Sequence, residues 1–148
     1  MMKRKLAVLA MIMLGSTPAW AALGNNAASV DSDAQVLGGQ HAIVAKAGFN
    51  LHQITMQDGS TVNEYVSPAG TVFAISWKSH FMPNLNQLLG SYLTNLQQGQ
   101  RTQWIRRRAV TIQGNDFVLT SFGRMGSFQG RAYVPSLVPA NLTAEVVQ

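Results

Sequence analysis

Cysteine is absent from the 148 residues of this chain. Without a thiol the protein forms no disulfide bond, and thiol catalysis, disulfide exchange and cysteine-ligated zinc or iron–sulfur sites are excluded. The attachment of a lipid to an N-terminal cysteine is excluded for the same reason. The folded chain must therefore be stabilised by the burial of apolar surface rather than by covalent cross-links.

A membrane-length apolar run is also missing. The apolar stretch near the N-terminus spans only residues 6–14, whereas a helix that crosses a bilayer needs about 20 residues. Three basic residues precede this stretch, and a helix-ending segment and the small-residue motif Ala19-Trp20-Ala21 follow it. This order predicts a secretion signal over residues 1–21, cleaved between Ala21 and Ala22. We expect the periplasm as the destination, with an extracellular or outer-membrane-associated location as the alternative.

Charge is sparse in the predicted mature chain. Cleavage after residue 21 leaves 127 of the 148 residues and removes three of the 11 basic ones, so that eight remain against six acidic residues, a net charge of +2. So small a net charge argues against nucleic acid as a partner. The mature length suits one domain with no transmembrane segment, and its oligomeric state stays open.

Two kinds of pattern predict the secondary structure. Alternating apolar residues between turn sequences predict strands, and leucines at a spacing of three to four predict a helix that begins with a capping box of Asn84 and Gln87. The small, polar residues 22–48 predict a loosely ordered arm with one helical turn and a short edge strand over 42–45. The predicted strands are residues 51–56, 61–66, 71–77, 110–113, 117–122 and 128–134, and the predicted helix is residues 84–98.

These elements predict a single α+β domain over residues 49–139. Three strands, one helix and three strands form an antiparallel meander sheet of about five or six strands, and the single amphipathic helix covers one face of it. Two prolines, Pro135 and Pro139, end the regular structure, so residues 140–148 are expected to form a frayed C-terminal tail.

Three segments of the mature chain carry a family resemblance. They are EYVSPAG at 64–70 running into VFA at 72–74, FMPNL at 81–85 with LLGSY at 88–92, and GRAYVP at 130–135 with LVP at 137–139. Together with the mature start at residues 22–24, they resemble the family of small exported proteobacterial proteins catalogued as domain of unknown function 2844. The resemblance covers nearly the whole mature chain and implies an envelope location. It implies no reaction, cofactor or catalytic residue.

A basic cluster is the most suggestive candidate for a binding site. Trp104, Arg106, Arg107 and Arg108 follow the predicted helix, and three guanidinium groups suit phosphates, lipid headgroups or an acidic protein. The alternative is a solvated basic linker that protects a sheet edge. A second candidate is a concave sheet face lined by Tyr65, Trp77, Arg131 and Tyr133. These four residues are equally consistent with core and rim positions.

Catalytic and metal sites receive little support from the sequence. His41, His52 and His80 lie far apart and form no metal-binding motif, so no metal or cofactor is expected. No serine has the context of a hydrolase nucleophile, although Ser127 lies in a glycine-flanked loop. The carboxylates Glu64 and Asp116 are expected on a solvated strand face and in a turn. We therefore assign no catalytic residue.

Three functions remain open at this stage. The first is a non-enzymatic envelope module that binds a protein partner or an anionic surface. The second is a small periplasmic hydrolase, which a pocket with a histidine close to a serine or carboxylate would favour. The third is a structural subunit whose arm over 22–48 completes the sheet of a neighbour.

Overall fold

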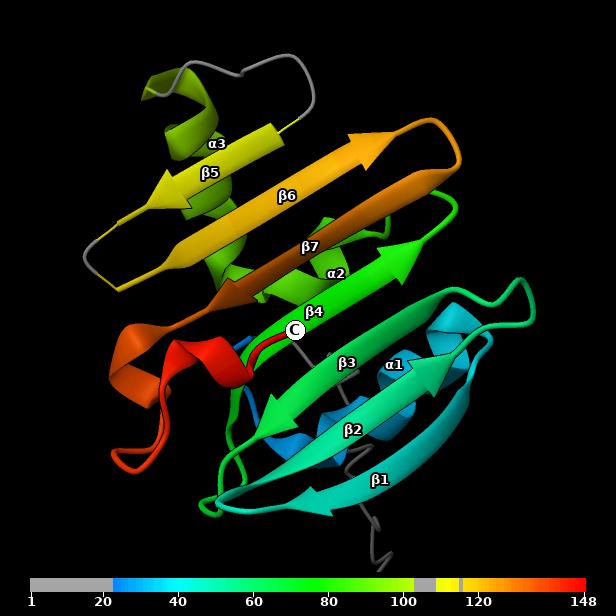
Figure 1. Cartoon of the computed structure of the whole chain (residues 1–148), viewed down its shortest axis with the longest axis vertical. Helices are drawn as coiled ribbons and strands as arrows, with labels where there is room; N and C mark the ends of the chain where they lie inside the picture. The colour runs from blue at the N-terminus through cyan, green and yellow to red at the C-terminus, as the bar shows by residue number, and fades with distance from the viewer. Residues whose placement is uncertain (1–22, 103–108, 115) are drawn as a thin grey trace, which may run out of the picture.

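The computed structural model describes residues 23–102, 109–114 and 116–148, and these residues build a seven-stranded antiparallel sheet (Figure 1). The strands lie in the order β1-β2-β3-β4-β7-β6-β5. Two meanders, β1 to β4 and β5 to β7, are joined because β7 pairs with β4. The strands are β1 (Gln40–Lys46), β2 (Phe49–Thr55), β3 (Thr61–Val66), β4 (Val72–Ser79), β5 (Ala109–Gln113), β6 (Val118–Arg124) and β7 (Ser127–Tyr133).

The α+β class and the antiparallel sheet are confirmed, but the predicted strand count is too low. The additional strand is β1, which lies in the segment 22–48 that the sequence predicts as a loosely ordered arm. All seven of its residues pair with β2 across a two-residue turn at Ala47 and Gly48. The prediction stopped at a short strand over 42–45 because small alanines give that segment a weak alternating pattern.

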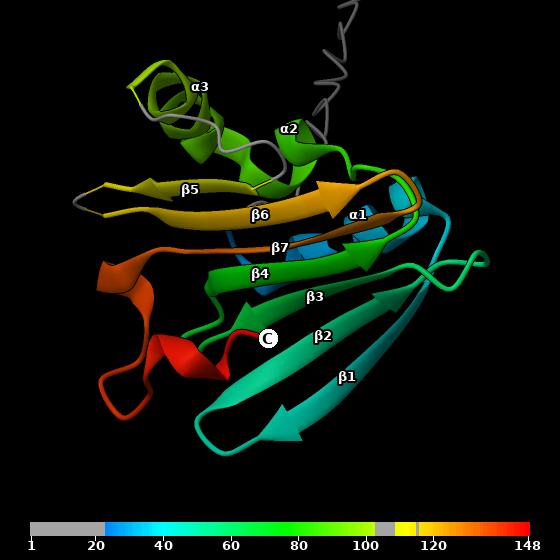
Figure 2. The ribbon, with the colours of Figure 1, turned by 45° about the horizontal axis from the view of Figure 1, so that its top comes forward.

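The prediction of a single covering helix is wrong. The face is covered by α1 (Val30–Leu37), α2 (Leu85–Leu89) and α3 (Leu93–Thr102), which lie on the same side of the sheet (Figures 1 and 2). The expected helix breaks at Gly90, whose φ of 51° and ψ of −122° lie outside the helical region. Only glycine reaches that conformation readily, so the leucine pattern continues through a break in the backbone.

The capping box is confirmed in one half only. Asn84 caps α2 by accepting a hydrogen bond from the N–H of Asn86 at 3.1 Å. Gln87, the expected second member, is instead buried under α1 and donates to Asp33 at 2.7 Å. No helix in the described ranges is long and apolar enough to cross a membrane.

Apolar side chains form a cluster on each face of the sheet, and the two clusters differ in size. The larger cluster lies between the sheet and the helices and includes Ile54, Val62, Ile75, Leu88 and Leu119. A smaller one on the opposite face contains Tyr65, Phe73 and Val147. Residues 140–148 therefore do not fray, because Val147 is fully buried against this face and anchors the C-terminal segment there (Figure 2).

Candidate functional site

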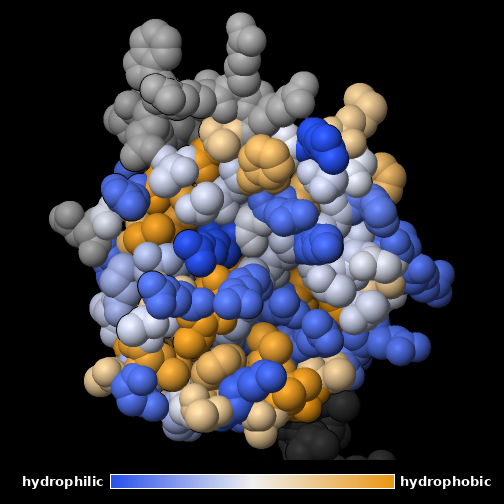
Figure 3. Space-filling model, in the orientation of Figure 1, coloured by the Kyte–Doolittle hydropathy of each residue, from blue (hydrophilic) through white to orange (hydrophobic). Residues whose placement is uncertain are grey.

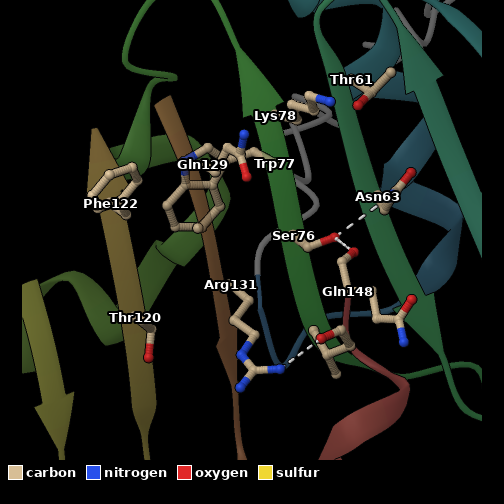
Figure 4. Close-up of a pocket in the computed structure, with 12 residues that line it drawn as sticks. Thr61, Asn63, Ser76, Trp77, Lys78, Thr120, Phe122, Gln129, Arg131 and Gln148 are labelled. Carbon is tan, nitrogen blue, oxygen red and sulfur yellow. Dashed lines mark hydrogen bonds between the residues drawn. The ribbon is translucent and has the colours of Figure 1, made fainter. Parts of the chain in front are cut away.

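A concavity of about 480 Å³ opens on the sheet face opposite the helices. It lies over β3, β4, β7 and β6, and the C-terminal segment closes one end of it (Figure 4). Hydrophilic side chains crowd the middle of this face, and apolar ones gather toward its lower end (Figure 3). The lining residues are Thr61, Asn63, Ser76, Trp77, Lys78, Thr120, Phe122, Gln129, Gly130, Arg131, Val147 and Gln148.

The register of the sheet arranges the floor of the concavity in two rows. Residues directly opposite each other on paired strands point to the same face, as do alternate residues of one strand. The row nearer the C-terminal segment runs Asn63, Ser76, Arg131, Thr120. The outer row runs Thr61, Lys78, Gln129, Phe122.

The C-terminal segment is bound to this floor through its main chain. Arg131 Nη1 donates to the carbonyl oxygen of Val147 at 2.9 Å, and Ser76 Oγ donates to the main-chain oxygen of Gln148 at 2.5 Å (Figure 4). The hydroxyl of Tyr65 also donates to the Gln148 oxygen, at 2.8 Å, and accepts from the Gln148 N–H at 3.0 Å. The polar side chains of the sheet thus contact main-chain atoms of a segment that lies across them.

The charge of the concavity has one sign. Among the described residues, Lys78 and Arg131 are the only ionisable side chains that line the concavity, and no aspartate or glutamate does so. Neither cation forms an ion pair within the described part of the chain. Phe122 adds an aromatic ring that is 52% exposed at the end of the outer row. An anionic ligand with apolar groups suits such a surface.

The expected lining of a concave sheet face is correct for the side chain of Arg131 only. Tyr65 and Tyr133 lie on the same face but pack in the apolar cluster with the C-terminal segment. Trp77 borders the concavity, but its side chain points to the helix-covered face and packs in the larger cluster there. Lys78 and Gln129 were missed. Their signal was the alternation of polar residues along their strands, but only the pairing of β4 with β7 places them side by side.

The four residues of the predicted basic cluster, Trp104, Arg106, Arg107 and Arg108, lie outside the described residues. The same is true of the predicted cleavage site at Ala21 and Ala22. Both stay predictions.

Two of the three histidines meet on the helix-covered face. His41 Nδ1 lies 2.6 Å from Asp31 Oδ1, and His41 Nε2 lies 3.0 Å from His52 Nδ1, so that α1, β1 and β2 are connected. Burial lowers the pKa of His52, as does the positive charge of His41, while Asp31 acts in the opposite direction. His80 lies apart and contacts the carbonyl oxygen of Gly126.

This histidine pair gives the hydrolase hypothesis no nucleophile. The second ring nitrogen of His41 faces His52 instead of a hydroxyl, and neither histidine lines the concavity. Among the described residues, no group of three or more histidine and acidic side chains could hold a metal ion.

Glu64 is a buried carboxyl group rather than part of a solvated strand face, so this expectation is wrong. Only 1% of its surface is exposed. Burial, then the negative charge of Asp33 and a hydrogen bond to it, raise the pKa of Glu64 to about 9. Glu64 is therefore neutral at pH 7 and can donate its proton to Asp33. Asp116 lies in the connection between β5 and β6 and accepts from the N–H and hydroxyl of Ser136 at 3.0 and 2.8 Å, so it ties this connection to the segment after β7.

Comparison with known proteins places the chain in a family but assigns no chemistry. Residues 19–147 match the family model described as protein of unknown function DUF2844. No curated protein and no solved structure matches the chain. The match covers both meanders, the helices and the C-terminal segment that closes the concavity. The chain therefore belongs to the DUF2844 family.

Proposed function

We propose that this protein is a non-enzymatic binding module that takes an extended, acidic segment of a partner protein in the concavity of its open sheet face. The observation that carries the proposal is the seating of the C-terminal segment. Ser76, Tyr65 and Arg131 already bind main-chain atoms of Val147 and Gln148 there. A surface whose side chains contact a main chain in this way suits a further peptide better than a compact solute.

The two cations indicate where acidic side chains would bind. Lys78 on β4 lies opposite Gln129 on β7, and Arg131 follows Gln129 by two residues on β7. Lys78 and Arg131 are therefore diagonal neighbours with Cα atoms about 7–8 Å apart. Side chains on one face of an extended peptide repeat about every 7 Å. Carboxylates at positions i and i+2 of such a peptide can therefore meet Lys78 and Arg131 together.

Peptide binding tests this proposal. A fluorescent Glu-Val-Glu-Val-Glu peptide is expected to bind the mature protein with salt-sensitive affinity, and its lysine counterpart is not, as measured by fluorescence anisotropy. K78E should weaken binding at least tenfold, because it replaces attraction with repulsion inside the concavity. The matched control is R124E, an identical charge change at an exposed residue that does not line the site. Equal binding by K78E and R124E would refute the proposal.

Export forms part of the same proposal. The order of the leader's charged, apolar and small residues supports removal of residues 1–21 and action of the domain in the periplasm or beyond it. We expect the native protein recovered from an envelope fraction to begin at Ala22 when its mass is measured. A mass that starts at Met1, in protein from the cytosol, would contradict this prediction.

A further inference from the structure

Strand β1 leaves a bare edge at one end of the sheet. It pairs with β2 along one side, and no other described element lies beyond its outer side (Figures 1 and 2). Ile43 is 60% exposed and Val44 is 41% exposed. Ile43 pairs with His52 and points to the helix-covered face, so its neighbour Val44 points to the open face. Apolar side chains thus flank the free edge on both faces.

This edge lacks the protection that sheet edges usually have. Exposed edges are blunted by proline, by bulges, by inward-pointing charges or by short length, since a bare strand can pair with another chain. β1 contains no proline, keeps an unbroken register with β2 over seven residues, and carries its one lysine, Lys46, at its end. Contacts from Asp31 and His52 to His41 hold it as a formed strand.

We propose that two copies of this chain pair through β1, antiparallel, about a two-fold axis at Ile43, and so continue the sheet from one copy to the next. The strand is complementary to itself in this register. Ile43 faces Ile43 of the second copy, Ala42 faces Val44, and His41 faces Ala45. Lys46 faces Gln40, so no like charges oppose each other. Registers centred on other residues leave part of the strand unpaired.

The concavity stays open in this arrangement. It lies over β3, β4, β6 and β7, whereas the axis passes beside β1 at the sheet's end. The pairing is therefore independent of the proposed peptide binding, and either can fail without the other.

The absence of cysteine makes the register directly testable. In the cysteine-free chain, I43C places two thiols opposite each other on the axis, and mild oxidation is expected to link the dimer. In this register position 42 of one copy faces position 44 of the second copy. A42C and V44C should therefore each cross-link poorly when present as the single variant, and a mixture of the two variants should cross-link efficiently. M125C, at a side chain that is 98% exposed in the β6–β7 turn, is the control for random collision.

Sedimentation of the mature protein supplies the second measurement. We expect a concentration-dependent dimer, and we expect I43K to raise its dissociation constant at least tenfold, because two lysines then face each other on the axis. The substituted side chain is exposed, so the fold should persist. A monomer at all concentrations, or I43C cross-linking no faster than M125C, would overturn the proposal. The β1 amides that do not bond to β2 point to the free edge. Their protection from hydrogen exchange in a monomer would show that the chain covers its own edge, and this too would overturn the proposal.

Discussion

Replacing Gly130 with alanine is expected to destabilise the fold by about 3 kcal/mol, near the upper end of what overpacking usually costs. A Cβ atom at this position would lie 2.2 Å from Cζ2 and 2.6 Å from Cε2 of Trp77, and 2.8 Å from the carbonyl oxygen of Thr120. One neighbour is a buried ring and the other is backbone. Neither can move aside without disturbing the sheet.

The reason for this crowding is the position of Gly130 in the sheet. It lies opposite Trp77 on β4 and opposite Ser121 on β6. The indole of Trp77 is only 3% exposed and occupies the space that a side chain at 130 would need. Its Nε1 is buried with no hydrogen-bond partner among the described residues, so packing alone holds the ring in place.

Thermal unfolding followed by circular dichroism would check this prediction, and the melting temperature of G130A should fall by roughly 10 °C. G114A is the matched control, since a Cβ there would lie 3.4 Å from the Phe117 carbonyl oxygen, an ordinary contact. Both variants lose the same backbone freedom in the unfolded state, so their difference reports the clash. In a W77L background the cost of G130A should shrink. A G130A protein as stable as G114A would contradict the packing described here.

The strands from residue 49 onward were largely predictable because their signals are local. β3 was predicted with its observed bounds, and the ends of β6 and β7 shift by one or two residues. Turn sequences such as Asp58-Gly59 and alternating apolar residues involve only a few neighbouring positions, so they predict turns and strands without knowledge of the tertiary contacts. The break in the helix at Gly90 was harder to predict. Leucines at helical spacing predict one apolar face, but they do not show whether the helical backbone is interrupted along it.

The candidate site depends on contacts between distant segments, which periodicity does not report. Ser76 and Arg131 become neighbours only because β7 returns beside β4. The burial of Glu64 had a signal that was not used. It lies two residues after Val62, a core residue, and alternate residues of a strand share a face. The strand pattern could not predict that Asp33 lies beside the carboxyl group of Glu64, because Asp33 belongs to α1.

The buried carboxyl group at Glu64 predicts that stability falls as pH rises. Below about pH 4.5, its ordinary pKa, the group is protonated in both the folded and the unfolded chain. Between 4.5 and about 9 it stays protonated only in the folded chain, so unfolding releases a proton. The free energy of unfolding then drops by up to about 1.4 kcal/mol per pH unit. The loss reaches about 3 kcal/mol at pH 7 and levels off above pH 9.

The variant E64Q should remove this dependence. Its amide has nearly the shape of the protonated carboxyl group, can donate to Asp33 as that group does, and does not ionise. Urea unfolding at several pH values should show E64Q more stable than the natural protein by about 3 kcal/mol at pH 7, with the two converging near pH 4.5. E145Q, at an exposed carboxylate, is the control and should follow the natural protein throughout. Parallel curves for E64Q and the natural protein would count against a neutral Glu64.

The effect of burial on the pKa of Glu64 can be separated from the effect of Asp33 by a substitution at Asp33. Burial is the larger cause and the charge of Asp33 the next, so D33N should lower the pKa of Glu64 without returning it to its ordinary value. The carboxyl carbon resonance of Glu64 in a pH titration would measure both values. A complete return would mean that the neighbouring charge, and not burial, keeps Glu64 protonated. A carboxyl group that stays neutral under α1 links the stability of the helix-covered face to pH, whereas no acidic side chain in the described part of the chain lines the concavity on the other face.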